Sequence, residues 1–228
     1  MKAIASAVAG GIALVGSTVA CADGSAPAQA PNWSANFVSR LEALAVLETL
    51  NSELLSNDSA TLTLERWCDV HHLASPPRIK AVQVPDVYRP VSPEQRNELH
   101  VTPTEPVRYR RVQLKCGSTV LSEADNWYVP SRLTPEMNKL LDTTDTPFGR
   151  AVQALHFQRR TLSSEILWRP LPDGWEMNTA SAHAAVVPMP ANLLAHRAVL
   201  TLPDGTPFSE VVESYTANVL GFPVPLPQ

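Results

Sequence analysis

The chain has 228 residues, of which 44% are hydrophobic and 18% charged, and its formal net charge is −4. This length suits a single domain, while the mild acidity and the lack of a long basic run exclude the electrostatic footprint of a nucleic-acid-binding protein. We expect no metal site, because the adjacent histidines His71 and His72 point about 100° apart on a helix and have no third ligand nearby in sequence.

The amino-terminal segment has the composition of a secretory signal peptide. Ala3 to Val19 is rich in Ala, Gly and Ser and is followed by a small-x-small site. A transmembrane helix needs about 20 strongly apolar residues, so we expect cleavage rather than a membrane span. We predict a signal peptide at 1–22 and an exported, periplasmic protein. The alternative is a lipoprotein anchored through Cys21, which is disfavoured because threonine replaces the usual leucine three residues earlier.

Composition and apolar spacing predict the domain organisation and the first helix. An Ala/Pro/Ser-rich linker at 23–33 precedes one domain at 34–222, and 223–228 is a Pro-rich tail. Apolar residues recur at three- or four-residue steps between Phe37 and Leu54, which predicts an amphipathic helix. Ser34 is the expected N-cap of this helix.

Prolines mark the ends or starts of the next predicted elements. A second helix is predicted to begin at Asp58 or Ser59 and to end before Pro76, because proline cannot continue a helix. Ile79 to Val84 is predicted to be a strand. The Ser-Pro-Glu-Gln sequence at 92–95 then opens a short helical turn with proline at its first position.

The central region predicts a hairpin followed by two short helices. Two β-type runs, Val107 to Cys116 and Thr119 to Val129, flank a Gly-Ser turn and should form adjacent antiparallel strands. Thr134 and Thr146 each precede a proline, a pattern typical of a capped helix start.

The last third predicts three further strands. Phe157 to Trp168 has β-type composition, and Arg197 to Leu202 and Phe208 to Thr216 flank an Asp-Gly turn, a strong hairpin signal. The sum is an α+β fold in which helices back an antiparallel sheet.

Two cysteines remain after removal of the predicted signal. Cys68 and Cys116 are an even number, which in an oxidising compartment favours a disulfide. Two unrelated buried thiols are the alternative, because the sequence does not show whether the Cα atoms approach within about 7 Å.

The segment Val107 to Trp168 contains three distinctive pieces. They are an arginine-bearing strand that returns in a strand ending in Val-Pro, a Leu-Thr-Pro helix start, and the turn Thr-Pro-Phe-Gly-Arg at 146–150. Together they resemble chorismate pyruvate-lyase and its superfamily, which includes the effector-binding domains of GntR-type transcription regulators. The resemblance implies an antiparallel sheet with a ligand pocket under helical flaps, and a small aromatic or carboxylate ligand as partner. It also implies that no cofactor is needed.

The resemblance also implies a catalytic pair. The family's catalytic arginine matches Arg111, with Arg110 as the alternative one residue away. Its catalytic glutamate matches Glu213, with Glu210 as the rival in the other register. A one-residue slip would turn each side chain to the opposite face of the sheet, so only one arginine enters the pocket. The lyase reading requires Arg111 and Glu213 to converge on one enclosed cavity.

Three further positions match the family's ligand contacts. Phe148 and Gly149 stand in the Thr-Pro-Phe-Gly-Arg turn, where the family uses a backbone contact to the aromatic product. Ala60 replaces a methionine that covers the ligand, which predicts a smaller lid.

Three hypotheses on function follow, and in each we expect a monomer. The first is a lyase that eliminates pyruvate from chorismate to give 4-hydroxybenzoate. The second is an exported binding protein for a small aromatic or acidic ligand, without catalysis. The third is a structural envelope protein. Chorismate is made in the cytoplasm, so the predicted export argues against the first, and fold alone does not establish function.

Overall fold

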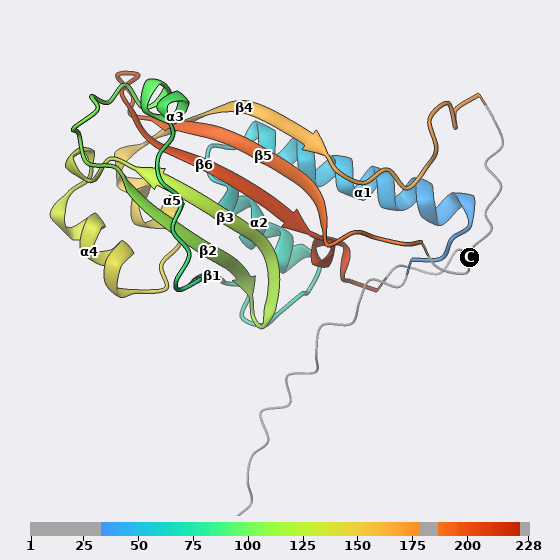
Figure 1. Ribbon diagram of the computed structural model, residues 1–228. Coiled ribbons are helices and arrows are strands. Elements are labelled where there is room, and N and C mark those ends of the chain that lie inside the picture. The colour runs from blue at the N-terminus through green and yellow to red at the C-terminus, as the bar shows by residue number, and fades with distance from the viewer. Residues whose placement is uncertain (1–32, 178–186, 224–228) are drawn as a thin grey trace, which may run out of the picture.

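The computed structural model describes residues 33–177 and 187–223. The predicted signal peptide at 1–22, with Cys21, lies outside the described residues, as do the linker up to residue 32 and the tail from 224. Six strands form one antiparallel sheet, which helices cover (Figure 1). The helices and strands are α1 (Phe37–Ser56), α2 (Ala60–Val70), β1 (Ile79–Gln83), α3 (Pro93–Glu98), β2 (Arg108–Cys116), β3 (Thr119–Tyr128), α4 (Pro135–Thr143), α5 (Phe148–Ala151), β4 (Gln158–Ile166), β5 (Asn192–Thr201) and β6 (Pro207–Thr216).

Two hairpins form the centre of the sheet, whose strand order is β1-β2-β3-β6-β5-β4. The β2–β3 turn contains Gly117 at φ 57° and the β5–β6 turn contains Gly205 at φ 86°, a left-handed conformation that glycine adopts at little cost. Pairing of β3 with β6 joins the hairpins, and β1 and β4 are the edge strands. None of the helices in the described residues is long and apolar enough to cross a bilayer.

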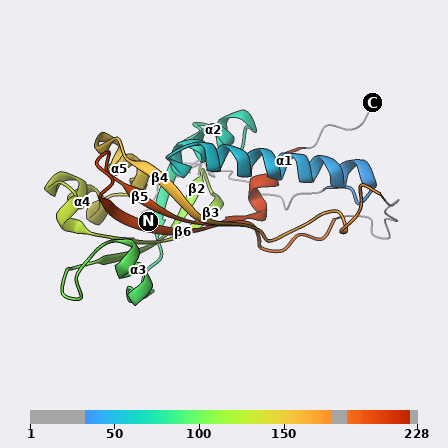
Figure 2. The same ribbon diagram turned by 90° about the horizontal axis from the view of Figure 1, so that it is seen from above.

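The two faces of the sheet have different covers. Figure 2 shows α1 and α2 together on one face, which we call the helical face, and α3 on the opposite face, which we call the α3 face. Both α4 and α5 lie at one end of the sheet, away from the long amino-terminal part of α1 (Figures 1 and 2).

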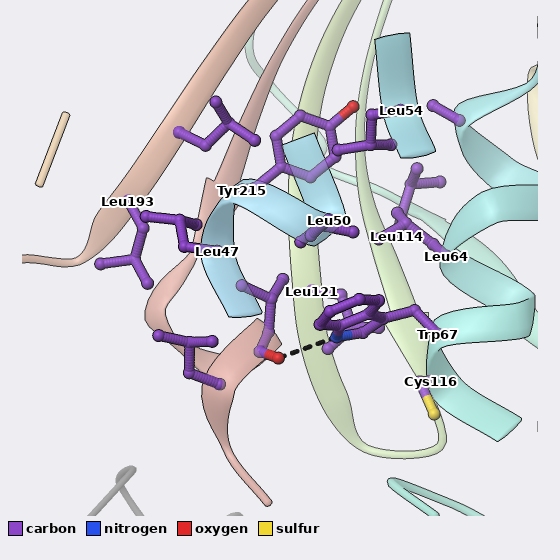
Figure 3. Packing of buried hydrophobic residues seen from close by; sticks show 14 of the residues in the cluster. Leu47, Leu50, Leu54, Leu64, Trp67, Leu114, Cys116, Leu121, Leu193 and Tyr215 are labelled. Carbon is purple, nitrogen blue, oxygen red and sulfur yellow. Dashed lines mark hydrogen bonds between the residues drawn. The ribbon is translucent and has the colours of Figure 1, made fainter. Parts of the chain in front are cut away.

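The main core lies between the helical face and the two long helices (Figure 3). The period predicted for the first helix is confirmed over its second half, since Leu47, Leu50 and Leu54 of α1 are completely buried, whereas Phe37 and Leu41 at its start are exposed. Trp67 of α2 packs into the same cluster, and its indole N–H donates to the carbonyl of Val219 at 2.8 Å. Each fully buried leucine side chain contributes about 1.5–3 kcal/mol relative to an exposed one.

A disulfide joins the helical layer to the sheet. Cys68, near the end of α2, is bonded to Cys116, the last residue of β2, and their Cα atoms lie 6.2 Å apart. Both side chains are fully buried. The bond closes a loop over a sequence separation of 48 residues, across β1 and the whole segment that leads to the central hairpin.

The α+β fold with an antiparallel sheet is confirmed, and two predicted helix starts are wrong. Asn36, not Ser34, caps α1: its Oδ1 accepts from the N–H of Ser39 at 2.8 Å, while Ser34 only accepts from the Asn36 amide. Thr146 does not cap a helix either, because its hydroxyl pairs with that of Thr144 and α5 begins without a side-chain cap.

Candidate functional site

The expected convergence of Arg111 and Glu213 is wrong. Residues that stand opposite each other in neighbouring antiparallel strands have side chains on the same face, and successive residues alternate between faces. Arg111 stands opposite Asp125, which stands opposite Val212. Glu213 is the next residue along β6 and stands opposite Ala124. Arg111 therefore points to the α3 face and Glu213 to the helical face.

Arg111 belongs to an ion-pair network on the α3 face. Its guanidinium donates to Asp125 at 3.0 Å and to Glu123 at 2.9 Å. Arg89 also pairs with Asp125, and the Tyr109 hydroxyl donates to the same carboxylate at 2.5 Å. Burial, together with the nearby carboxylate of Asp125, raises the pKa of Tyr109 to about 12. With its donors held by two carboxylates, Arg111 is not available to a ligand.

Glu213 is buried under the helices and is already paired. Arg159 on β4 donates to Glu213 Oε2 at 2.7 Å, and the Tyr215 hydroxyl donates to the same oxygen at 3.1 Å. The Arg159 and Glu213 side chains are only 4% and 6% exposed. Burial raises the pKa of Tyr215 well above its usual value, so this group remains a donor. Glu213 Oε2 thus accepts hydrogen bonds from a permanent cation and a neutral hydroxyl.

Next to this pair lies a histidine that the sequence analysis did not single out. His196 of β5 stands opposite Glu213 and is 1% exposed. Its Nε2 lies 2.9 Å from Asn51 Oδ1 on α1 and 3.0 Å from the Ser164 hydroxyl on β4. Burial lowers the pKa of His196 to about 4, because the protonated ring would lose its hydration and lies near Arg159.

This lowered pKa predicts a pH dependence of stability. The unfolded chain binds the histidine proton near pH 6.5, whereas the folded chain binds it only near pH 4. Stability is therefore expected to fall as the pH drops from about 6.5 to about 4, by about 3 kcal/mol in total. Urea denaturation of the wild type and of His196→Gln across this pH range measures the free energy of unfolding of each. The difference between the two profiles gives the contribution of the histidine, because the carboxyl groups contribute to both. Parallel profiles for the two proteins would contradict the prediction.

Arg110, the alternative arginine, faces the helical side but is not close to Glu213. It stands opposite Asn126 and is 7% exposed. One of its terminal nitrogens donates to the Thr146 carbonyl at 3.3 Å, and its ionisable neighbours are Tyr128 and Asp142. Burial lowers the pKa of Arg110. Its Nε and Nη1 are buried without a hydrogen-bond partner among the residues that the structure describes.

A groove of about 450 Å³ lies beside Arg110, at the edge of β2 just past the end of β1. One terminal nitrogen of Arg108, Nη1, donates at this groove to both carboxylate oxygens of Asp142 of α4, at 3.1 and 2.9 Å. That carboxylate is therefore satisfied by another arginine. The lining includes Gln83, Tyr88, Tyr109, Arg110, Tyr128 and Leu141. Among the described residues, Arg110 is a cation without a counter-ion of its own at this groove, which aromatic side chains line together with the polar Gln83, Arg108 and Asp142.

The three expected ligand contacts have packing roles in the structure, and none of them lines this groove. Phe148 packs against Tyr128, with ring centroids 5.4 Å apart. Ala60 is 5% exposed within the main core. A Cβ on Gly149 would lie 2.8 Å from the Ser59 hydroxyl, so glycine permits the close approach of α5 to the start of α2. A ligand role for these positions remains a prediction.

Comparison with known proteins gives a close sequence relative and distant structural likenesses. No family model matches the chain. It is 57% identical over 198 residues to the uncharacterized protein y4mC of Sinorhizobium fredii, covering 85% of this chain and 83% of that one.

The structural likenesses are to regulators. A possible transcriptional regulator of Bacillus subtilis, YydK, is 18% identical, with a TM-score of 0.39 over 65% of this chain; the match spans 62% of YydK. The effector domain of PhnF from Mycobacterium smegmatis is 12% identical, with a TM-score of 0.43 over 70% of this chain and 88% of that domain. Both TM-scores are low, so these likenesses assign no function to this chain.

Proposed function

We propose that this chain, which belongs to the family of the Sinorhizobium fredii protein y4mC, is an exported binding protein for a small aromatic carboxylate. The observation that carries the proposal is the buried guanidinium of Arg110, two nitrogens of which lack a partner within the described part of the chain. Export is supported by the small-residue-rich amino-terminal segment.

A carboxylate is the ligand group that best fits this arginine. A buried cation without a counter-ion is unfavourable, and a bound anion would remove that cost. Arginine forms charge-assisted hydrogen bonds with carboxylates, which are about twice as strong as neutral ones. Since Asp142 is held by Arg108, it does not neutralise Arg110 directly.

The remaining lining supports an aromatic body on the ligand. Tyr88 and Tyr109, whose ring centroids lie 5.9 Å apart, offer aromatic surface at the groove, whereas Tyr128 and Leu141 border it but are only 2% and 1% exposed. The volume of about 450 Å³ lies within the range of small-molecule sites. A single aromatic ring with a carboxylate fits these dimensions.

The contacts of Glu213 argue against lyase chemistry. Cleavage of the enolpyruvyl ether requires a proton donor near the ether oxygen, whereas Glu213 Oε2 accepts from both Arg159 and Tyr215. The groove is next to Arg110, and Glu213 does not line it. We therefore favour binding without turnover.

Binding of 4-hydroxybenzoate to the full chain tests the proposal. The wild type is expected to gain thermal stability with increasing ligand. Arg110→Met should lose this gain, yet its ligand-free melting temperature should match or exceed that of the wild type, because the change removes an unpaired buried charge. Incubation with chorismate should release no pyruvate.

The matched control is Arg160→Met, which also removes one positive charge. Arg160 forms an exposed ion pair with Glu98 and lies on β4, the edge strand on the other side of the sheet from the groove. This variant should bind 4-hydroxybenzoate as the wild type does. A ligand response that survives in Arg110→Met, or pyruvate release by the wild type, would overturn the proposal.

A further inference from the structure

We propose that the ligand of the Arg110 groove carries a peptide-like amide next to its carboxylate, and that this amide pairs with the free edge of β2. The ligand class is then an N-acylated amino acid, the chemical unit at the C-terminus of a peptide. This inference rests on the proposed carboxylate site and specifies what it binds.

Two hydrogen bonds fix the direction of the backbone groups in β2. The N–H of Val84 donates to the carbonyl of Arg111 at 2.9 Å, on the β1 side. The N–H of Val129 donates to the carbonyl of Phe208 at 2.9 Å, on the β6 side. Since the backbone groups of successive residues point to opposite neighbours, the odd-numbered residues in this part of β3 bond to β6 and the even-numbered ones to β2. Arg108 stands opposite Tyr128 and Arg110 opposite Asn126, so the backbone N–H and carbonyl groups of these two arginines form hydrogen bonds with β3.

The backbone groups of Tyr109 consequently point to the β1 side, where β1 has already ended at Gln83. The N–H and carbonyl of Tyr109 and the N–H of Arg111 have no backbone partner in residues 33–177 and 187–223. Proline at position 85 follows Val84 and has no N–H to offer. Within the part of the chain that the structure describes, three backbone groups along this strand edge are therefore without a hydrogen-bond partner.

The free edge and the unpaired cation meet at the same groove, because Tyr109 and Arg110 both line it. The Arg110 side chain leans to the β1 side, where its guanidinium reaches Thr146. The neighbouring Asp145 carbonyl accepts from the N–H of Ala81 on β1, which places this connection along the outer edge of the sheet. One extended ligand can thus contact the edge and the guanidinium together.

The charge at the groove selects the kind of amide ligand. Addition of a strand to a sheet edge uses the main chain of the ligand, with a repeat of about 3.4 Å per residue. An internal peptide segment would supply amides but no charge for Arg110. A terminal amino acid supplies a carboxylate within one residue of its acyl amide, so it satisfies both features.

A pair of ligands that differ at one atom tests the inference by calorimetry. 4-Hydroxybenzoylglycine carries the amide, and in 4-hydroxybenzoylglycolate an ester oxygen replaces the amide N–H. We expect the amide to bind about tenfold more tightly than the ester. The ester has no N–H to donate to the Tyr109 carbonyl, and its carbonyl oxygen is a weaker hydrogen-bond acceptor than that of the amide. Amide hydrogen exchange at Tyr109 and Arg111 should slow when the amide ligand is bound.

The outcomes separate this inference from the proposed function. Equal affinities of amide and ester, with binding lost in Arg110→Met, would overturn the edge pairing and leave the carboxylate site standing. Lack of binding by both ligands and by 4-hydroxybenzoate would overturn the proposed function and the inference together. A tenfold preference for the amide, also abolished by Arg110→Met, would support both.

Discussion

Replacement of Glu213 with alanine is expected to lower the free energy of unfolding by roughly 3–5 kcal/mol. The change leaves the Arg159 guanidinium buried under the helices, with its side chain 4% exposed and its carboxylate partner gone. The Tyr215 hydroxyl loses its acceptor at the same time. Urea denaturation of the wild type and Glu213→Ala measures the difference as a shift in midpoint.

Two further variants separate the loss of the pair from the loss of one charge. Arg159→Met combined with Glu213→Leu removes both charges, and it should recover most of the stability that Glu213→Ala loses. Glu123→Ala removes an ion-pair partner on the α3 face that is 34% exposed, so its effect should stay below about 1 kcal/mol. A loss of similar size in Glu123→Ala and Glu213→Ala would contradict the assigned difference in burial.

The orientation of the arginines could not be predicted from the sequence. Alternation along β2 places either Arg110 or Arg111 toward the helices, and the choice depends on the register. A β-bulge shifts the pairing of β2 with β3: Leu114 stands opposite Ser122 and Lys115 opposite Val120, so the extra residue lies in β3. Alternation along β2 itself is unbroken from Cys116 back to Arg110, so the face of the arginines follows once Cys116 is known to face the helices. The turn was predictable from its composition, but the disulfide that places Cys116 on the helical face was not.

The partner of Glu213 was missed for a different reason. Arg159 lies 54 residues earlier in the sequence, on β4, and reaches Glu213 across the intervening strand β5. Strand composition predicted β4 but not its place in the sheet. One signal was available: Arg159 and Arg160 are adjacent in a predicted strand, so alternation requires one of them to face the helices. A buried cation on that face needs a carboxylate, and Glu213 is one.

Local signals predicted most of the fold. Leucine spacing in α1, the Thr134 cap of α4 and the two glycine-containing turns depend on residues within a few positions of each other. The groove depends on where β1 ends relative to β2, which is a consequence of tertiary packing. No local pattern in either strand indicates the resulting free edge, so the candidate site became visible only in the structure.

Removal of the disulfide by the double replacement Cys68→Ala and Cys116→Ala is expected to lower the free energy of unfolding by about 4 kcal/mol. The loop spans a sequence separation of 48 residues, and this value follows from the chain entropy that the bond removes from the unfolded state. Urea denaturation of both proteins, each with and without a thiol reductant, provides the measurement. The reductant should lower the midpoint of the wild type and leave that of the double variant unchanged.

The same experiment bears on the proposed export. Both sulfur atoms are buried, so a reductant reaches them only when the chain opens, and the wild type should resist reduction under native conditions. A disulfide that persists in the protein recovered from cells would accord with an oxidising compartment. If the wild type instead carries two free thiols and the reductant does not change its urea midpoint, the predicted stabilisation by the disulfide is wrong. The amino-terminal segment would then be the remaining support for export.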